Sequence, residues 1–286
     1  MKKLLSVLLS LVLVVGLTAC GGSKDSTSGD ASSDGKQKET TVKIGLTGTI
    51  YEDIWNPIKE RLKGEGINIE LVQFSDFSLP NAALSDGEID MNAFQHHAYF
   101  NNDTETNGYE LSAIGDTFVI AMNIYSNKIK DVSELKDGDK VAVPNDASNE
   151  GRALKLLDSA GVITLKEDAG ANPEVKDIEK YNTKIELVEA DASNVFSMLP
   201  DVAAAVINGN YALDCGLDPQ KDGIFLEKDY ADDSYYCLIA VRSEDKDNEV
   251  YQRIVKEFQS EQTKEIFKEE FKGFFVPAWE LETNNK

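Results

Sequence analysis

The chain has 286 residues, of which 41% are hydrophobic and 28% are charged. This balance is typical of a globular protein and excludes wholesale disorder, a collagen and a multi-span membrane protein. With 29 Lys plus Arg against 51 Asp plus Glu, the formal charge is −22. Because so acidic a chain offers no basic surface for phosphates, we expect no nucleic-acid partner.

The first nineteen residues are predicted to be a signal peptide. Lys2 and Lys3 form a basic start, and residues 4–17 are apolar apart from two serines and a glycine. This stretch is shorter than the roughly 20 apolar residues that span a bilayer, and it suits the apolar region of a signal peptide. Leu17-Thr18-Ala19-Cys20 then resembles a bacterial lipobox, which implies cleavage before Cys20 and acylation of its side chain. An ordinary secretory peptide is the alternative.

A polar segment separates Cys20 from the folded body. Residues 21–40 contain no large apolar side chain, so nothing there offsets the entropy of ordering, and we expect a flexible tether over residues 20–40. Its reach is roughly 25 Å. The sequence therefore predicts a body held by lipid at the extracytoplasmic face of the cell membrane.

The body alternates predicted strands and helices. In its first part, the spacing of apolar residues predicts strands over residues 42–46, 67–74 and 89–94, and helices over 54–62, over 79–84 and from about 95. A long apolar run covers residues 111–125. The alternation then restarts, with strands over 141–144, 184–188, 203–207, 224–226 and 235–241 and helices over 147–160, 247–259 and 262–271.

This order of elements predicts an α/β fold that is rich in parallel strands. The two runs of alternating elements predict two α/β lobes joined by two hinge crossings. Lobe 1 is predicted to hold residues 41–121 plus 236–286, and lobe 2 residues 122–235. Since ligands of such folds bind at the carboxyl ends of strands, the residues that follow the predicted strands are the candidates for a site.

Residues 92–99 follow a predicted strand and hold Phe94, Tyr99 and the only two histidines of the chain. Aromatic faces suit an apolar or sulfur-bearing ligand side chain, and an imidazole supplies a hydrogen bond. Core aromatics at a helix start are the alternative. Adjacent His96 and His97 cannot both face one metal ion, so we expect neither a metal nor a cofactor.

Residues 141–152 lead a predicted strand into a helix that begins with Asn, Asp and Ser. The free N–H groups and the dipole of a helix start attract a carboxylate, and Arg152 on the first turn can donate two bonds to one. A cation at this helix end is misplaced unless an anion joins it. A ligand carboxylate is therefore predicted here; an ion pair of Arg152 with Glu150 or Asp146 is the alternative.

Asn208 follows the apolar strand over residues 203–207. Its amide both donates and accepts, so it can bind the amino and the carboxyl group of an amino acid; a helix cap is the alternative. Of four aromatic residues near strand ends, one or two are expected to reach the site: Tyr51, Phe74, Phe77 and Phe118.

Two cysteines remain besides Cys20, namely Cys215 and Cys237. In an oxidising compartment they could form a disulfide. The preferred interpretation is that both are small buried hydrophobic side chains.

Four ordered motifs resemble one known family. NAFQHHAYF, VAVPNDASNEGRALKLL, AAVINGNYA and KDGIFLE are similar to segments of the methionine-binding lipoproteins of bacterial ABC importers, the NlpA/MetQ family. The resemblance runs from about Val42 to Trp279. It implies a type II periplasmic-binding-protein fold, a methionine ligand in the L or D form, and an ABC permease and ATPase as partners.

The resemblance also implies roles for particular residues. Arg152 would hold the ligand carboxylate with Asn149 nearby, and Asn208 would bind the amino-acid head group. The thioether side chain would be surrounded by Phe94, His96, Tyr99, Phe118 and Phe74.

One segment departs from the family. Residues 120–126 lack the usual proline and contain Met122 and Asn123 instead, so the resemblance leaves a methionine-containing dipeptide and another amino acid open as ligands. An enzyme is not expected, because the two histidines are adjacent and no GxSxG motif is present. A surface adhesin lipoprotein is the remaining alternative.

Overall fold

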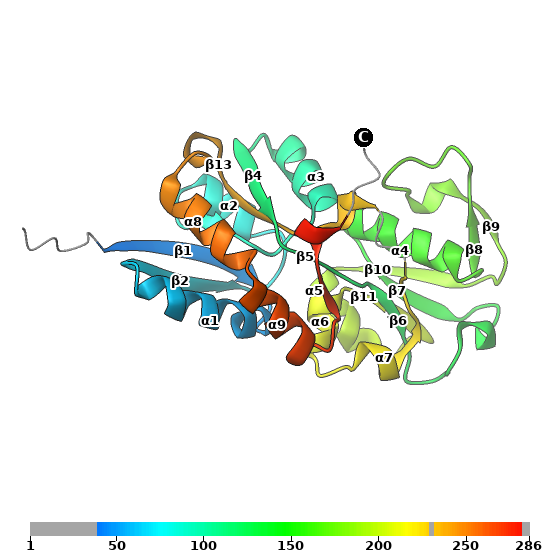
Figure 1. The fold of residues 1–286 in the computed structure, drawn as a ribbon. Helices are drawn as coiled ribbons and strands as arrows, with labels where there is room; N and C mark the ends of the chain where they lie inside the picture. Colours follow the sequence, from blue (N-terminus) through cyan, green and yellow to red (C-terminus); the bar gives the residue numbers. More distant parts are fainter. Residues whose placement is uncertain (1–38, 229–231, 282–286) are drawn as a thin grey trace, which may run out of the picture. The chain divides into compact units, whose positions relative to one another are not determined.

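The computed structural model describes residues 39–228 and 232–281 (Figure 1). The predicted signal peptide, Cys20 and the tether up to residue 38 lie outside this range. Within the described part of the chain, no helix is long and apolar enough to cross a bilayer. The described body is mixed α/β, as predicted.

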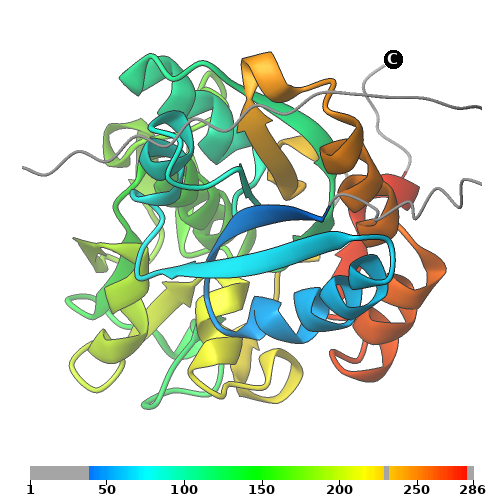
Figure 2. The same ribbon diagram turned by 90° about the vertical axis from the view of Figure 1, so that its left-hand side faces the viewer.

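The first of two five-stranded sheets has the order β2 (Ile67–Phe74), β1 (Thr40–Thr47), β3 (Met91–Asn92), β13 (Leu238–Arg242) and β4 (Leu111–Asp116). β1 runs parallel to β2 and β3, whereas β13 is antiparallel to β3 and β4. Val42, Ile44 and Leu46 of β1 are buried, as the period-two pattern predicted, and Gly45 and Thr47 are buried as well. Figure 2 looks onto β1 and β2 with α1 (Ile50–Lys63) packed beneath them.

The second sheet has the order β10 (Glu186–Ala190), β7 (Lys140–Pro144), β11 (Ala204–Ile207), β6 (Asn123–Tyr125) and β12 (Gly223–Phe225). β7 is parallel to β10 and β11, and β6 is antiparallel to β11 and β12. β7 and β11 are buried on both faces. Because both faces are buried, both sets of side chains are apolar, and the two strands appear in the sequence as short continuous apolar runs.

The chain passes between the two sheets twice. It leaves the first sheet after β4, passes through β5 (Phe118–Ile120) and enters the second at β6; it returns between β12 and β13. β5 pairs with β14 (Phe275–Pro277) near the end of the chain. Each sheet takes its strands from one of the two predicted lobes, and the lobe boundaries themselves stay a prediction.

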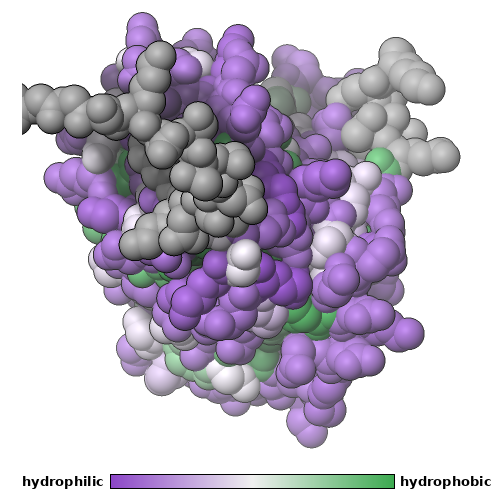
Figure 3. All heavy atoms as spheres, turned by 60° about the vertical axis from the view of Figure 1, so that its left-hand side comes forward, coloured by the Kyte–Doolittle hydropathy of each residue, from purple (hydrophilic) through white to green (hydrophobic). Residues whose placement is uncertain are grey.

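The remaining elements are mostly helices on these sheets. They are α2 (Pro80–Ser85), α3 (His97–Asn107), α4 (Ala147–Ser159), α5 (Ala192–Val195), α6 (Gly209–Asp214), α7 (Pro219–Asp222), α8 (Glu249–Phe258), α9 (Glu261–Glu269) and the hairpin β8 (Ile163–Leu165)–β9 (Ile178–Tyr181). The face seen in Figure 3 is mostly hydrophilic. Among the described large apolar side chains only Leu79 is exposed, at 43%.

Several predicted bounds differ from the structure. β3 is two residues long because the chain leaves the sheet at Ala93, and β13 begins only at Leu238 because residues 233–235 form a 3-10 turn. β10 begins two residues later than predicted. The hairpin β8–β9 and the short helices α5, α6 and α7 were not predicted, since segments this short carry little periodicity.

The two cysteines of the body are both free. Cys237 is buried, as the preferred interpretation requires, whereas Cys215 is exposed. The expectation of two buried thiols was therefore wrong for Cys215, which follows the last residue of the short helix α6.

Helix α1 is capped by a residue from far along the chain. Thr49 at its N-cap position makes no side-chain capping bond. Instead Oδ1 of Asp214 accepts from the backbone N–H of Ile50 at 2.8 Å and from Oγ1 of Thr49 at 2.9 Å. A carboxylate at this end satisfies a free N–H and complements the helix dipole.

Replacing Asp214 by alanine is expected to lower the free energy of unfolding by about 1 kcal/mol, the usual cost of losing a cap. Urea unfolding followed by circular dichroism measures this change. Asp214→Asn keeps the acceptor oxygen and should lose much less. Equal losses in the two variants would show that capping is not what Asp214 contributes.

Candidate functional site

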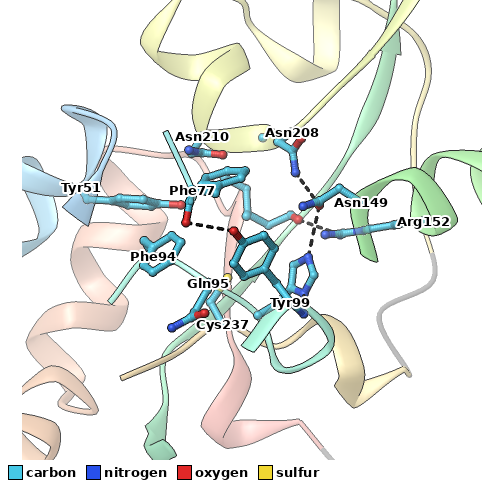
Figure 4. A pocket seen from close by; sticks show the side chains of 13 residues that line it. Tyr51, Phe77, Phe94, Gln95, Tyr99, Asn149, Arg152, Asn208, Asn210 and Cys237 are labelled. Atoms are coloured by element: carbon cyan, nitrogen blue, oxygen red, sulfur yellow. Dashed lines mark hydrogen bonds between the residues drawn. The ribbon is translucent and has the colours of Figure 1, made fainter. Parts of the chain in front are cut away.

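One cavity lies where residues following several strands converge. Most of the lining comes from segments after β1, β2, β3, β7 and β11, since ligands of such folds bind at the carboxyl ends of strands. The residues are Tyr51, Phe77, Phe94, Gln95, His96, Tyr99, Ile120, Asn149, Arg152, Asn208, Gly209, Asn210 and Cys237. Figure 4 shows Asn149, Asn208 and Arg152 to the right of the rings of Tyr51, Phe77 and Phe94.

His96 is held as a neutral imidazole of defined tautomer. Its Nδ1 accepts from the backbone N–H of Tyr99 at 3.1 Å, so the proton is on Nε2, which donates to Oδ1 of Asn149 at 3.2 Å. Burial, reinforced by the positive charge of Arg152, lowers the pKa of His96 from 6.5 to about 3. His96 therefore presents no positive charge to the cavity at neutral pH.

Asn149 joins the polar side chains of the cavity. Its Oδ1 accepts from His96 and from Nδ2 of Asn208, the latter at 2.7 Å. Its Nδ2 donates to both carboxylate oxygens of Asp146 at 3.0 Å, which settles which end of the amide is oxygen. Burial raises the pKa of Asp146. Both lone pairs of the Asn149 amide oxygen are thus engaged within the protein.

The amide oxygen of Asn208 is left for a ligand. Because its Nδ2 donates to Asn149, its Oδ1 is turned away, and that oxygen is buried with no hydrogen-bond partner. Asn208 does precede α6, but its side chain makes no capping bond, so the helix-cap interpretation was wrong. A buried acceptor without a partner is costly, and an N–H group of a ligand would satisfy it.

Arg152 is buried, with 4% of its surface exposed, and most of its guanidinium is already bonded. Nε and Nη2 donate to the two carboxylate oxygens of Glu227 at 2.8 and 2.6 Å, and Nη2 also donates to the carbonyl of Ile120 at 2.9 Å. The ring of Tyr235 stacks on the guanidinium at 4.5 Å. Among the described residues, Nη1 has no hydrogen-bond partner.

The alternative predicted for Arg152, an ion pair with an acidic side chain, is correct, but the predicted partners are wrong. An acid does pair with the guanidinium, but it is Glu227, which lies 75 residues further along the chain, and neither Glu150 nor Asp146. Glu227 follows β12, so nothing in the sequence near Arg152 pointed to it. The expected two-bond contact with a ligand is reduced to what Nη1 can donate.

Three aromatic rings form the other wall of the cavity. Phe77, Phe94 and Tyr99 have ring centroids 5.9–6.0 Å apart, and the hydroxyl of Tyr99 donates to the carbonyl of Phe77 at 2.9 Å. Tyr51 adds a fourth ring. Such rings offer apolar faces to a thioether or an aliphatic side chain.

Two residues assigned to the pocket do not line this cavity. Phe118 is 2% exposed and packs in the core against Tyr51 and Phe275. Phe74 ends β2 and packs against the cluster around Leu84. Phe77 and Tyr51 reach the cavity instead, because the strand ends turn these two rings inward.

Five lining residues were not predicted: Gln95, Ile120, Gly209, Asn210 and Cys237. Gln95 and Asn210 lie inside motifs singled out from the sequence, and Nδ2 of Asn210 donates to the carbonyl of Thr47 at 3.0 Å. Nothing in the sequence distinguished Cys237. Among the described residues, no group of three His, Cys, Asp or Glu side chains could hold a metal ion.

The protein has two mixed β-sheets covered by helices and joined by two crossings, with a cavity at the carboxyl ends of the strands. This arrangement defines a substrate-binding protein of the periplasmic type. The chain belongs to the NlpA lipoprotein family, whose pattern matches residues 42–279. The predicted family is thereby confirmed.

Relatives and solved structures agree with this assignment. The chain is 38% identical to the probable D-methionine-binding lipoprotein MetQ of Pasteurella multocida, over 95% of this chain and 97% of that protein. It is 44% identical to the D-methionine-binding lipoprotein MetQ of Escherichia coli K12, over 83% and 88%. A nutrient-binding protein from Burkholderia cenocepacia, solved with methionine bound, is similar with a TM-score of 0.78 and 41% identity, over 82% of this chain and 99% of that one.

Proposed function

We propose that this protein is the substrate-binding lipoprotein of an ABC importer and that it captures methionine in the cavity. The observation that carries the proposal is that the cavity holds a hydrogen-bond acceptor and a hydrogen-bond donor without partners in the described part of the chain, beside a wall of aromatic rings. Oδ1 of Asn208 lacks a donor and Nη1 of Arg152 has no acceptor among the described residues. The ammonium and carboxylate of an α-amino acid supply both.

The charges of the site favour a zwitterion. Arg152 is balanced by Glu227, and His96 is neutral because burial lowers its pKa to about 3. A ligand with net charge would leave that charge unbalanced in a buried site, which is costly. A methionine zwitterion adds no net charge, and its thioether fits the rings of Phe77, Phe94 and Tyr99.

Proteins related in sequence and structure support the choice of methionine. The relatives from Pasteurella and Escherichia carry names that state D-methionine binding, and the Burkholderia structure holds methionine. The L and the D form both remain within the proposal. Both ring nitrogens of His96 are occupied by Tyr99 and Asn149, so this imidazole is not poised as a base, and we expect binding without turnover.

Capture would proceed by closure of two lobes, residues 41–121 plus 236–286 and residues 122–235. The ligand would touch Arg152 and Asn208 from lobe 2 and the rings of Phe94 and Tyr99 from lobe 1. Because all these contacts exist only in the closed form, the ligand shifts the population towards it. Acyl chains on Cys20 would keep the protein beside its permease and ATPase, which raises its effective concentration there.

Thermal unfolding tests the proposal. The protein, refolded to remove carried-over ligand, is heated with each amino acid, with D-methionine and with the dipeptide Gly-Met. Methionine at a hundred times its dissociation constant should add roughly 2.7 kcal/mol and raise the midpoint by about 5–11 °C. A shift with a different ligand alone would replace methionine in the proposal, and no shift at all would favour the adhesin.

A further inference from the structure

The carboxylate of Glu227 contacts Arg152, which lines the cavity. It holds Arg152 by the Nε and Nη2 edge of the guanidinium, and only 5% of the Arg152 side chain and 12% of the Glu227 side chain are exposed. A bidentate pair of this kind fixes the plane of the guanidinium as well as its position. The face of that plane is covered by Tyr235.

This arrangement decides which part of Arg152 a ligand can reach. The two hydrogens of Nη2 are taken by Glu227 and the carbonyl of Ile120, and Nε is taken by Glu227. Nη1 remains, and Arg152 lines the cavity. Without Glu227, the flexible side chain of Arg152 would be free to rotate, and the donor offered to the ligand would change.

Glu227 is itself tied to the first crossing between the sheets. Its Oε2 accepts from the backbone N–H of Met122 at 2.8 Å, and its own backbone N–H donates to Oδ1 of Asn123 at 2.9 Å. Asn123 is 1% exposed. Met122 and Asn123 lie where the chain passes from β5 into β6, so the segment that leads from the first sheet to the second is the one that anchors Glu227.

We propose that Glu227, anchored on Met122 and Asn123, is a positioning residue that presents Nη1 of Arg152 to the carboxylate of the ligand. The inference rests on the proposed function, since it names how that site recognises a carboxylate. It also makes Glu227 a determinant of specificity, because a ligand that lacks the carboxylate gains nothing from a fixed Nη1.

The test compares two ligands in one variant. Glu227→Gln keeps the shape of the side chain and removes its charge. Its affinity for methionine should fall roughly 10- to 100-fold, whereas its affinity for methioninamide, which lacks the carboxylate, should fall by a clearly smaller factor. Calorimetric titration measures both. An equal loss for the two ligands would mean that Glu227 only supports the fold, and would overturn the inference.

A matched control is Glu186→Gln, which removes the charge from an exposed ion pair with Lys140 and should leave both affinities unchanged. Asn123→Ala removes the acceptor for the Glu227 backbone and should reproduce part of the loss for methionine alone. If Glu186→Gln alters the ratio of the two affinities as Glu227→Gln does, the effect is one of overall charge and the inference fails.

A second measurement needs no ligand, and so separates this inference from the proposed function. The chain has four arginines, so the nuclear magnetic resonance signals of their Nε–H groups are few, and Arg152→Lys identifies the one from Arg152. That proton should exchange slowly with solvent in the wild type and at least ~10-fold faster in Glu227→Gln, since its acceptor is weakened. Unchanged exchange would overturn the inference even if methionine binds.

Discussion

Replacing Arg152 by alanine should lower the free energy of unfolding by about 3–5 kcal/mol, even without ligand. The reason is that the side chain of Glu227 is only 12% exposed, and the variant leaves its carboxylate buried without the guanidinium. Urea unfolding at neutral pH measures the loss. The same variant should bind methionine too weakly to shift its melting temperature, because the cavity loses the Nη1 donor proposed for the ligand carboxylate.

Two comparisons isolate the buried ion pair. Lys140→Ala breaks an exposed pair, in which the side chains are 53% and 61% exposed, and should cost at most about 1 kcal/mol. The double variant Arg152→Met with Glu227→Leu removes both charges and should recover most of the stability but none of the binding. An Arg152→Ala protein as stable as the wild type would show that the other contacts of Glu227, such as that with the N–H of Met122, suffice for its carboxylate.

The second large effect is a loss of folding stability at acidic pH. In the folded protein the pKa of His96 is about 3, whereas it is 6.5 in an unfolded chain. The unfolded state therefore binds more protons between these values. The stability that neutral His96 contributes is fully present above pH 6.5 and is lost as the pH falls towards 3. The loss is about 2 kcal/mol by pH 5 and roughly 5 kcal/mol over the whole window.

Measuring the free energy of unfolding from pH 7 to pH 4.5 in wild type and in His96→Gln tests this. The variant cannot take up the proton, so its stability should fall less steeply by up to about 1.4 kcal/mol per pH unit. His97→Gln is the control, since that ring lies 32% exposed beside Asp116. Parallel curves for wild type and His96→Gln would mean that His96 is not neutralised by burial.

Much of the fold follows from local patterns. β1, β2, α1 and α4 lie within four residues of their predicted bounds, because each carries a regular spacing of apolar residues and ends at a glycine or a polar turn. Elements without such spacing were missed. The hairpin β8–β9 has three and four residues per strand, too few to show a period.

The site divides in the same way. Phe94, His96, Tyr99, Asn149, Arg152 and Asn208 were all named from sequence, and all six line the cavity. Each follows a strand that is recognisable from its apolar residues, and the carboxyl ends of parallel strands converge in any such fold. Their contacts with a ligand stay a prediction.

Tertiary structure alone decided what each of these side chains can do. Arg152 looked free to bind a carboxylate with two bonds, until the fold brought Glu227 from 75 residues away onto the same edge of the guanidinium. Phe77 lines the cavity while Phe118 packs in the core, a difference that depends on how each backbone segment is turned. The sequence by itself determined the elements, the family and the polar and aromatic residues of the site, because these depend on local periodicity and on motifs. Pairing, burial and hydrogen-bond direction belong to the folded chain, because they depend on residues that only folding brings together.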